Sequence, residues 1–111
     1  MNDRGRRIGL NEAVFRQVNE RLEDVNRAFG SVSETMEIVC ECGNIDCSER
    51  IVLSIPEYES LRAEPTLFAV VSGHESADVE AVVDRRNGYD VVRKVAGDPA
   101  RIAEETDPRS D

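Results

Sequence analysis

The chain has 111 residues and a formal net charge of −9, with 23 acidic residues against 14 lysines and arginines. This length fits one small domain, whose modest core would gain stability from a bound metal. The acidic balance argues against nucleic-acid binding, because affinity for a phosphate backbone depends on basic patches. No hydrophobic run is long enough for a membrane span or a signal peptide, which predicts a cytoplasmic protein.

The N-terminal part predicts a flexible basic arm followed by an amphipathic helix. Residues 1–9 contain three arginines and one aspartate, and terminal segments of this kind are usually disordered. Residues 10–30 have a helical period, with Asn11 placed to cap the start and Gly30 placed to end the helix. The apolar stripe consists of Phe15, Val18, Leu22, Val25 and Phe29, and the opposite side carries Glu12, Arg16, Glu20, Glu23 and Arg27.

This apolar stripe requires a surface to cover it, and the sequence leaves three choices open. The stripe packs on the chain's own domain, pairs with a second copy of the helix, or docks on another protein. Helices of globular proteins most often turn their apolar face to their own core, so we expect that arrangement here. Two heptads are too few to favour a stable free coiled coil.

Residues 36–105 predict a small α+β domain, and residues 106–111 predict a loose tail. Segments 36–39 and 50–53 have the composition of two strands that form a hairpin, with the cysteines at its tip. Ser54-Ile55-Pro56-Glu57 is a capping box for a short helix that runs from about Pro56 to Arg62. Within it, Tyr58 and Leu61 are expected to face the core.

The remainder of the domain predicts further strands and a last helical turn. Residues 67–71 form a continuous apolar run, which indicates a buried strand. Asn87-Gly88 lies between β-branched runs, which favours a hairpin that pairs residues 80–86 with residues 89–95. Asp98-Pro99 then begins a helical segment through Ile102 and Glu105.

Three cysteines lie within eight residues, at Cys40, Cys42 and Cys47, and the single histidine is His74. Three thiols and one imidazole are the ligands of a closed tetrahedral zinc site. A reducing cytoplasm and an odd number of cysteines both disfavour disulfides. We therefore predict Zn²⁺ bound by these four residues. The two sulfurs of the Cys-x-Cys step must approach one another, and Gly43 is expected to provide the curl through a positive φ.

Other roles for this cluster stay open at the level of sequence. If His74 does not ligate, Glu41, Asp46, Glu75 or water are the alternatives. Three protein ligands and a water would be the arrangement of a catalytic zinc, with Glu75 as candidate base. A solvated surface acid is the simpler interpretation of Glu75, and no phosphate loop, nucleophile elbow or HExxH motif accompanies it. Closely spaced thiols also release zinc on oxidation, which is the behaviour of a redox sensor.

The Cys-Glu-Cys-Gly turn with its later cysteine, at residues 40–47, and the Gly-His-Glu turn at residues 73–75 make a fairly specific combination. Together with residues 11–21 and 58–70, they resemble a family of small proteins from high-GC Gram-positive bacteria. The resemblance runs over roughly residues 11–108. It implies a bacterial cytoplasmic protein with a shared set of three cysteines and one histidine, and it implies no catalytic residue and no substrate.

These observations predict an α+β protein with an N-terminal amphipathic helix and a small antiparallel β domain held together by zinc. The favoured function is an acidic protein–protein interaction or regulatory module without catalysis. A thiol-based redox or zinc sensor is the alternative, and a zinc-dependent enzyme is less favoured because no catalytic set is evident. The expected partner is another protein with a basic surface. A homodimer through the N-terminal helix is a further arrangement, and we expect neither nucleic acid nor a membrane.

Overall fold

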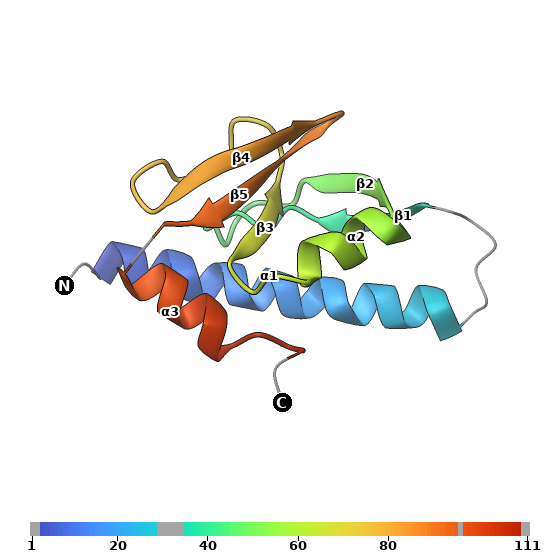
Figure 1. Cartoon of the computed structure of the whole chain (residues 1–111), viewed down its shortest axis with the longest axis horizontal. Coiled ribbons are helices and arrows are strands. Elements are labelled where there is room, and N and C mark those ends of the chain that lie inside the picture. Colours follow the sequence, from blue (N-terminus) through green and yellow to red (C-terminus); the bar gives the residue numbers. More distant parts are fainter. Residues whose placement is uncertain (1–2, 29–34, 96, 110–111) are drawn as a thin grey trace.

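The computed structural model describes residues 3–28, 35–95 and 97–109 and has an α+β fold (Figure 1). Both sheets and α2 lie on one side of the long helix α1, and α3 lies along the N-terminal half of that helix. The described elements, in chain order, are α1 (Asp3–Ala28), β1 (Thr35–Val39), β2 (Arg50–Ser54), α2 (Ile55–Arg62), β3 (Leu67–Val70), β4 (Glu80–Arg86), β5 (Tyr89–Lys94) and α3 (Gly97–Glu105).

The strands form two antiparallel sheets, as the hairpin signals predict. β1 pairs with β2, and the order in the second sheet is β3-β5-β4. Arg86 pairs with Tyr89, so Asn87 and Gly88 form a two-residue turn. Gly88 has a φ of +91°, a left-handed conformation that glycine adopts without a steric penalty. The predicted hairpins of residues 36–53 and 80–95 are therefore confirmed.

α2 begins with the predicted capping box. The backbone N–H of Ser54 donates to Oε1 of Glu57 at 2.9 Å, and the N–H of Glu57 donates to Oγ of Ser54 at 3.1 Å. These two bonds satisfy backbone donors that a helix start otherwise leaves open. Tyr58 and Leu61 are buried as expected. They join a core to which every residue of β3 contributes.

The beginning of α1 differs from the prediction of a flexible arm over residues 1–9. The helix already starts at Asp3, so residues 3–9 belong to it. Ile8 is buried, and a Cβ at Gly43 would lie only 2.5 Å from its side chain, so the two residues pack closely. Asn11 is therefore inside the helix and not at its cap, and its Nδ2 donates to the carbonyl of Gly43 at 2.9 Å. Phe29 and Gly30 lie outside the described residues.

The C-terminal segment is also held more firmly than the predicted loose tail of residues 106–111. Arg109 makes ion pairs at 2.7 Å with Glu20, 3.0 Å with Glu23 and 2.7 Å with Glu59. These contacts connect the end of the chain to both α1 and α2. Residues 106–109 therefore contact the domain through Arg109, and residues 110–111 lie outside the described part.

α1 packs on the sheets with its polar face, which is the reverse of the predicted orientation. Glu12, Arg16, Asn19 and Glu23 are at most 3% exposed. Phe15 and Leu22 are half-buried. Four aliphatic side chains on the other side of the helix are 40–53% exposed, namely Leu10, Val14, Val18 and Val25. The polar stripe therefore makes the central contact with the domain, while Leu22, from the apolar stripe, packs against the edge of the core.

Specific partners explain how charged side chains fill this contact. The guanidinium of Arg16 lies 4.7 Å from the ring centroid of Phe68 and donates to the carbonyls of Pro65 at 2.5 Å and Ala103 at 2.7 Å. Glu12 forms an ion pair with Lys94. Buried polar groups are tolerated when such partners satisfy them.

Among the helices of the described residues, none is long and apolar enough to span a membrane.

Candidate metal centre

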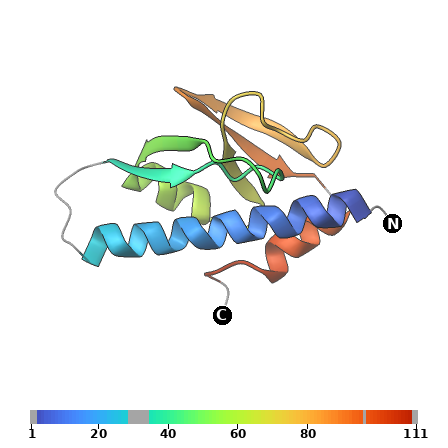
Figure 2. The ribbon, with the colours of Figure 1, turned by 180° about the vertical axis from the view of Figure 1, so that it is seen from behind.

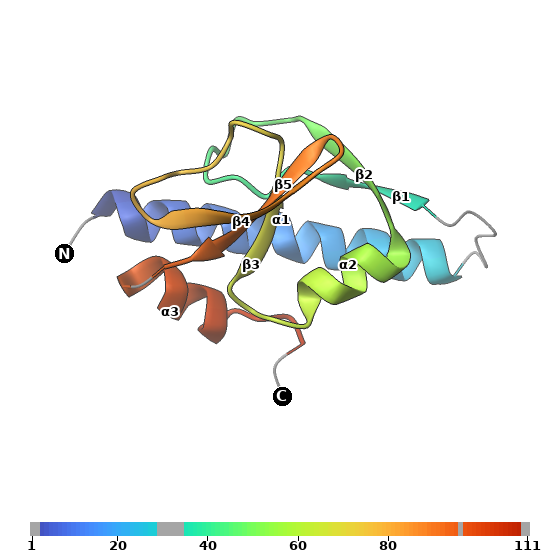
Figure 3. The same cartoon turned by 45° about the horizontal axis from the view of Figure 1, so that its top comes forward.

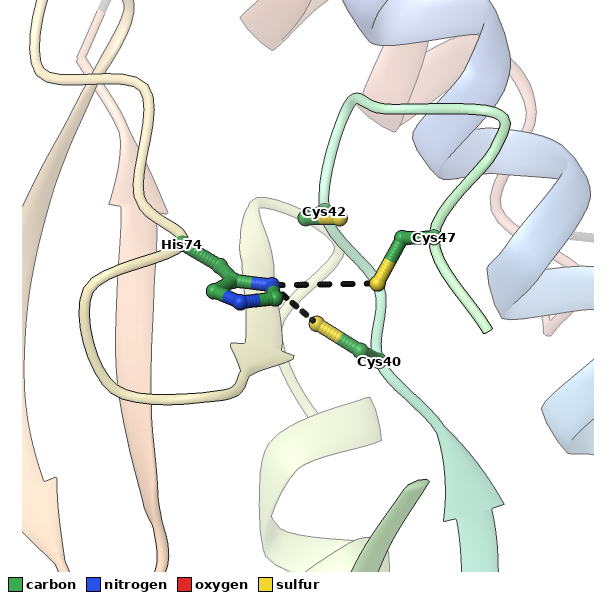
Figure 4. A group of neighbouring side chains, drawn as sticks. All are labelled: Cys40, Cys42, Cys47 and His74. Atoms are coloured by element: carbon green, nitrogen blue, oxygen red, sulfur yellow. Dashed lines mark hydrogen bonds between the residues drawn. The ribbon is translucent and has the colours of Figure 1, made fainter. Parts of the chain in front are cut away.

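Cys40, Cys42, Cys47 and His74 converge beside the β1–β2 hairpin (Figure 4). One ligand atom from each residue lies within 4.8 Å of all the others. Nδ1 of His74 is 3.6 Å from Sγ of Cys40 and 3.7 Å from Sγ of Cys47. In a tetrahedral zinc site the usual bond lengths place a sulfur and a nitrogen about 3.6 Å apart. The three thiols are free, so the four predicted residues are close enough to hold a metal ion.

Backbone hydrogen bonds on both sides position the cysteine segment. Beyond β1, the N–H of Cys40 donates to the carbonyl of Glu49 at 3.0 Å, and the N–H of Glu41 donates to the carbonyl of Ala69 at 2.8 Å. The N–H of Cys47 donates to the carbonyl of Asn44 at 3.0 Å, which closes the turn that returns Cys47 to the cluster. The segment is therefore anchored to β3 as well as to its own hairpin.

The predicted positive φ at Gly43 is wrong. The glycines with positive φ in the described residues are Gly73, Gly88 and Gly97. Gly43 instead permits the close approach of Ile8, since any Cβ would collide with that side chain. The left-handed glycine of the site is Gly73, with a φ of +90°, directly before His74.

His74 reaches the cluster from a turn that follows β3. Its N–H donates to the carbonyl of Val71 at 2.9 Å, and this bond closes the turn. Nδ1 faces the sulfurs, while Nε2 lies 3.8 Å from a carboxylate oxygen of Glu49. Metal-binding histidines commonly present their second nitrogen to a carboxylate, which fixes the tautomer and the ring orientation. The ring is thus oriented to ligate through Nδ1.

The thiols differ in their acidity. A hydrogen bond from the Cys40 thiol lowers the pKa of Cys42 to about 5, and the same bond raises the pKa of Cys40. Burial raises the pKa of Cys47. The backbone N–H of Val71 donates to Sγ of Cys40 at 3.2 Å, an interaction that also stabilises a metal-bound thiolate. A metal would find one thiolate already formed and would displace protons from the other two thiols.

Glu41 lies between two of the cysteines but faces the interior. Its carboxylate accepts hydrogen bonds from Nδ2 of Asn19 at 2.7 Å, from Arg62 at 2.8 Å and from the N–H of Ala69 at 3.0 Å. Side chains alternate along an extended segment, so the Cys-Glu-Cys spacing itself directs Glu41 away from the sulfurs. The close ligand group found in the described residues contains none of the alternative ligands Glu41, Asp46 and Glu75.

Asn19 is the supporting residue that the sequence analysis missed. Its side chain donates to the carbonyl of Val39 at 2.9 Å and accepts from the N–H of Val39 at 2.8 Å, immediately before Cys40. Together with the bond from Asn11 to Gly43, these contacts fix both ends of the segment 39–43 to α1. Asn11 and Asn19 are two turns apart on the helix, and this spacing is the signal available in the sequence.

One side of the cluster opens on a surface cleft lined by Cys42, Gly43, Asn44, His74 and Ser76. Small solutes such as chelators and oxidants can therefore reach the edge of the cluster that Cys42 and His74 form. Comparison of the chain with protein-family models, with curated proteins and with solved structures finds no match.

Proposed function

We propose that this chain is a zinc-stabilised module for protein–protein interaction or regulation, without catalysis, in the bacterial cytoplasm. The observation that carries the proposal is the set of four ligand atoms within 4.8 Å, with sulfur-to-nitrogen distances that suit a tetrahedral ion. Three thiolates and one imidazole are the donors of structural zinc sites, whereas harder ions such as Mg²⁺ prefer oxygen.

A structural role for the ion follows from its ligands. Four protein ligands complete a tetrahedral shell and leave no position for a substrate or an activated water. The cysteines follow β1, and His74 follows β3, so the ion would join the two sheets. In a chain of this length such a link adds stability that a small core supplies only in part.

The interaction role is supported by two surfaces. The outer side of α1 exposes a row of aliphatic side chains, which in soluble proteins often marks a contact with another protein. The net charge of −9 favours a partner with a basic surface for the remaining faces and disfavours a nucleic acid.

Metal analysis of the chain purified from its own host tests this proposal. We expect one zinc per chain, and we expect Cys47→Ser to lose metal and thermal stability together. Ser48→Ala changes an exposed neighbour in the same loop and should retain both. A native chain that is folded and carries no stoichiometric metal would contradict the proposal.

A thiol-based sensor of oxidants or zinc is the second candidate, favoured by the cleft beside the cluster. A peroxide would oxidise two neighbouring thiolates to a disulfide, be reduced to water or an alcohol, and release the ion. This role predicts rapid zinc release by mild peroxide, reversed by a thiol reductant and added zinc. Metal that stays bound until the chain unfolds would exclude it.

A further inference from the structure

A hollow of about 150 Å³, here called the α2 hollow, lies between α2 and the β4–β5 hairpin. Four aliphatic side chains line it, one each from β2, α2, β3 and β5, namely Leu53, Leu61, Leu67 and Val91. In Figure 1 α2 and the β4–β5 hairpin lie toward the viewer, whereas α1 lies in front in the opposite view of Figure 2. The α2 hollow also shares no lining residue with the cleft beside the candidate metal centre, so it is a separate feature of the surface.

Ion pairs between α2 and the β3-β5-β4 sheet border the α2 hollow. Glu57 accepts hydrogen bonds from the hydroxyl of Tyr89 at 2.9 Å and from Arg86 at 3.3 Å. Glu64 pairs with Arg93 at 2.7 Å. Glu57 lies in the first turn of α2 and Glu64 lies just after its end, so both ends of the helix are tied to the sheet. These links hold the walls of the hollow in place, and a preformed site binds without the cost of ordering it.

The volume of the α2 hollow selects an occupant of the size of one apolar side chain. A cavity of about 150 Å³ with aliphatic walls holds a molecule as large as benzene. The ring of phenylalanine has that size, whereas a drug-sized ligand or a cofactor occupies a pocket of about 300–1,000 Å³. In protein interfaces, a single aromatic or aliphatic side chain in such a pocket often supplies much of the binding free energy.

The charges around the mouth of the α2 hollow favour a basic partner. They are three carboxylates and two guanidiniums, those of Glu57, Glu64, Asp84, Arg86 and Arg93. The mouth therefore has an excess of negative charge, as does the whole chain with its net charge of −9. Each of these five side chains is at least 36% exposed, so each remains accessible to a partner. Lysine or arginine beside the apolar anchor would gain favourable contacts here, and acidic neighbours would be repelled.

We propose that the α2 hollow binds one phenylalanine-sized side chain of a partner protein, presented by a segment with lysine or arginine on either side of it. The inference rests on the interaction role proposed above, and it names a surface and a partner chemistry for that role. The aliphatic walls remove the ring from water, and the carboxylates of Glu57 and Glu64 attract the flanking cations. A tripeptide with one such anchor should bind with a dissociation constant on the order of 1 mM.

Titration of the zinc-loaded full chain with acetyl-Arg-Phe-Arg-amide tests the proposal by heteronuclear NMR. The peptide should shift the methyl resonances of the four aliphatic residues that line the α2 hollow, and the shifts should saturate. Acetyl-Arg-Ala-Arg-amide should bind at least about fivefold more weakly, because it lacks the anchor. Acetyl-Glu-Phe-Glu-amide should bind about two- to tenfold more weakly, because its charges are reversed. If the alanine peptide or the glutamate peptide binds as tightly as the first, the proposed occupant is wrong.

Substitutions at the rim of the α2 hollow test the same contact from the side of the protein. Ser60 lines the hollow and is exposed, so Ser60→Trp places a large ring there without replacing a core residue. This variant should lose the peptide-induced shifts, whereas Gln17→Trp, at an exposed position of α1, should bind as the wild type does. Glu64→Gln should weaken binding of the arginine peptide by about two- to fivefold and leave acetyl-Gly-Phe-Gly-amide unaffected. Unchanged binding of the arginine peptide by Ser60→Trp overturns the site.

Metal content measured on the same samples separates this inference from the zinc proposal. A zinc-loaded chain that binds none of the peptides overturns the α2 hollow as a docking site and leaves the metal role standing. A native chain that carries no zinc and still binds the arginine peptide contradicts the metal role and supports the site. Methyl shifts that depend on protein concentration without peptide would assign the hollow to a second copy of the chain and would also overturn the proposal. Circular dichroism of each variant shows that loss of binding is not loss of the fold.

Discussion

Glu12, Glu80 and Lys94 form a cluster of two carboxylates and one ammonium with no solvent exposure of their side chains. Nζ of Lys94 contacts an oxygen of each carboxylate. Burial raises the pKa of Glu12 to about 9, and the nearby charge of Glu80 adds to this effect. Glu12 is therefore protonated at neutral pH, which removes one negative charge from the cluster. Burial favours such a reduction of charge.

This protonation gives the first prediction. The pKa of Glu12 in the folded chain lies above its ordinary value of 4.5, so the folded state holds a proton that the unfolded state releases. The free energy of unfolding should fall as the pH rises from about 4.5 through about 9. Glu12→Gln, which cannot ionise, should flatten this slope in urea titrations at several pH values with saturating zinc.

Glu37→Gln provides the control for this prediction. Glu37 lies on β1, and its side chain is 60% exposed. The substitution therefore removes a carboxylate at the surface and leaves the buried carboxylates unchanged. This variant should keep the slope of the wild type. If Glu12→Gln also keeps that slope, Glu12 is ionised in the folded chain and the assignment of the proton is wrong.

At the scale of the elements, local signals predicted much of the fold. The capping box at Ser54 and the Asn87-Gly88 turn act within a few residues, and both formed as the sequence indicates. The sequence also grouped the cysteines with His74 correctly, because thiols and an imidazole are the donors of a single metal site. Such signals do not depend on distant parts of the chain.

The orientation of α1 was missed because it depends on distant partners. Glu12, Arg16, Asn19 and Glu23 have spacings of four, three and four residues, so the polar stripe follows the helical period as well as the apolar one does. Periodicity locates both stripes but does not say which one is covered. That choice is made by groups such as Phe68, Lys94 and the backbone of Val39, none of them near α1 in the sequence.

The connection between α1 and the candidate metal centre gives the second prediction. Asn19→Ala removes hydrogen bonds to both backbone groups of Val39 and to the buried carboxylate of Glu41. Unsatisfied buried groups cost about 1–3 kcal/mol each, so we expect a loss of roughly 2–4 kcal/mol after partial rearrangement. Urea denaturation measures this loss, and the zinc affinity from competition with a chelator should fall as well.

Asn26→Ala is the matched control on the same helix. Nδ2 of Asn26 donates to the carbonyl of Leu22 at 2.8 Å, a bond within α1 that does not reach the domain. Because alanine also has the higher helix propensity, this change should be nearly neutral. Equal losses in the two variants would mean that asparagine at position 19 serves the helix alone and not the metal centre.

At the scale of the whole molecule, the candidate metal centre lies where three parts of the fold meet. Figure 3 shows the loops after β1 and after β3 side by side above α1. The N–H of Glu41 joins the first loop to β3, and the side chains of Asn11 and Asn19 join it to the helix. The pairing of β3 with β5, by contrast, includes none of the four ligands. The core around Phe68 and Val92 takes most of its side chains from other residues of both sheets and of α2.

This division predicts partial, and not global, unfolding when the metal is removed. A chelator should abolish hydrogen-exchange protection of residues 40–47 and 71–76 and reduce it in the N-terminal half of α1, because a bound ion would supply the link between these segments. Protection in β3 and β5 should persist, because their hydrogen-bonded pairing includes no ligand and most of the core around them consists of other side chains. Mass spectrometry of exchange with and without chelator measures both, and added zinc should restore the original pattern. Uniform loss of protection along the chain would mean that the β3-β5-β4 sheet cannot fold without the ion. An unchanged pattern would mean that the four ligands do not link the sheets and the helix.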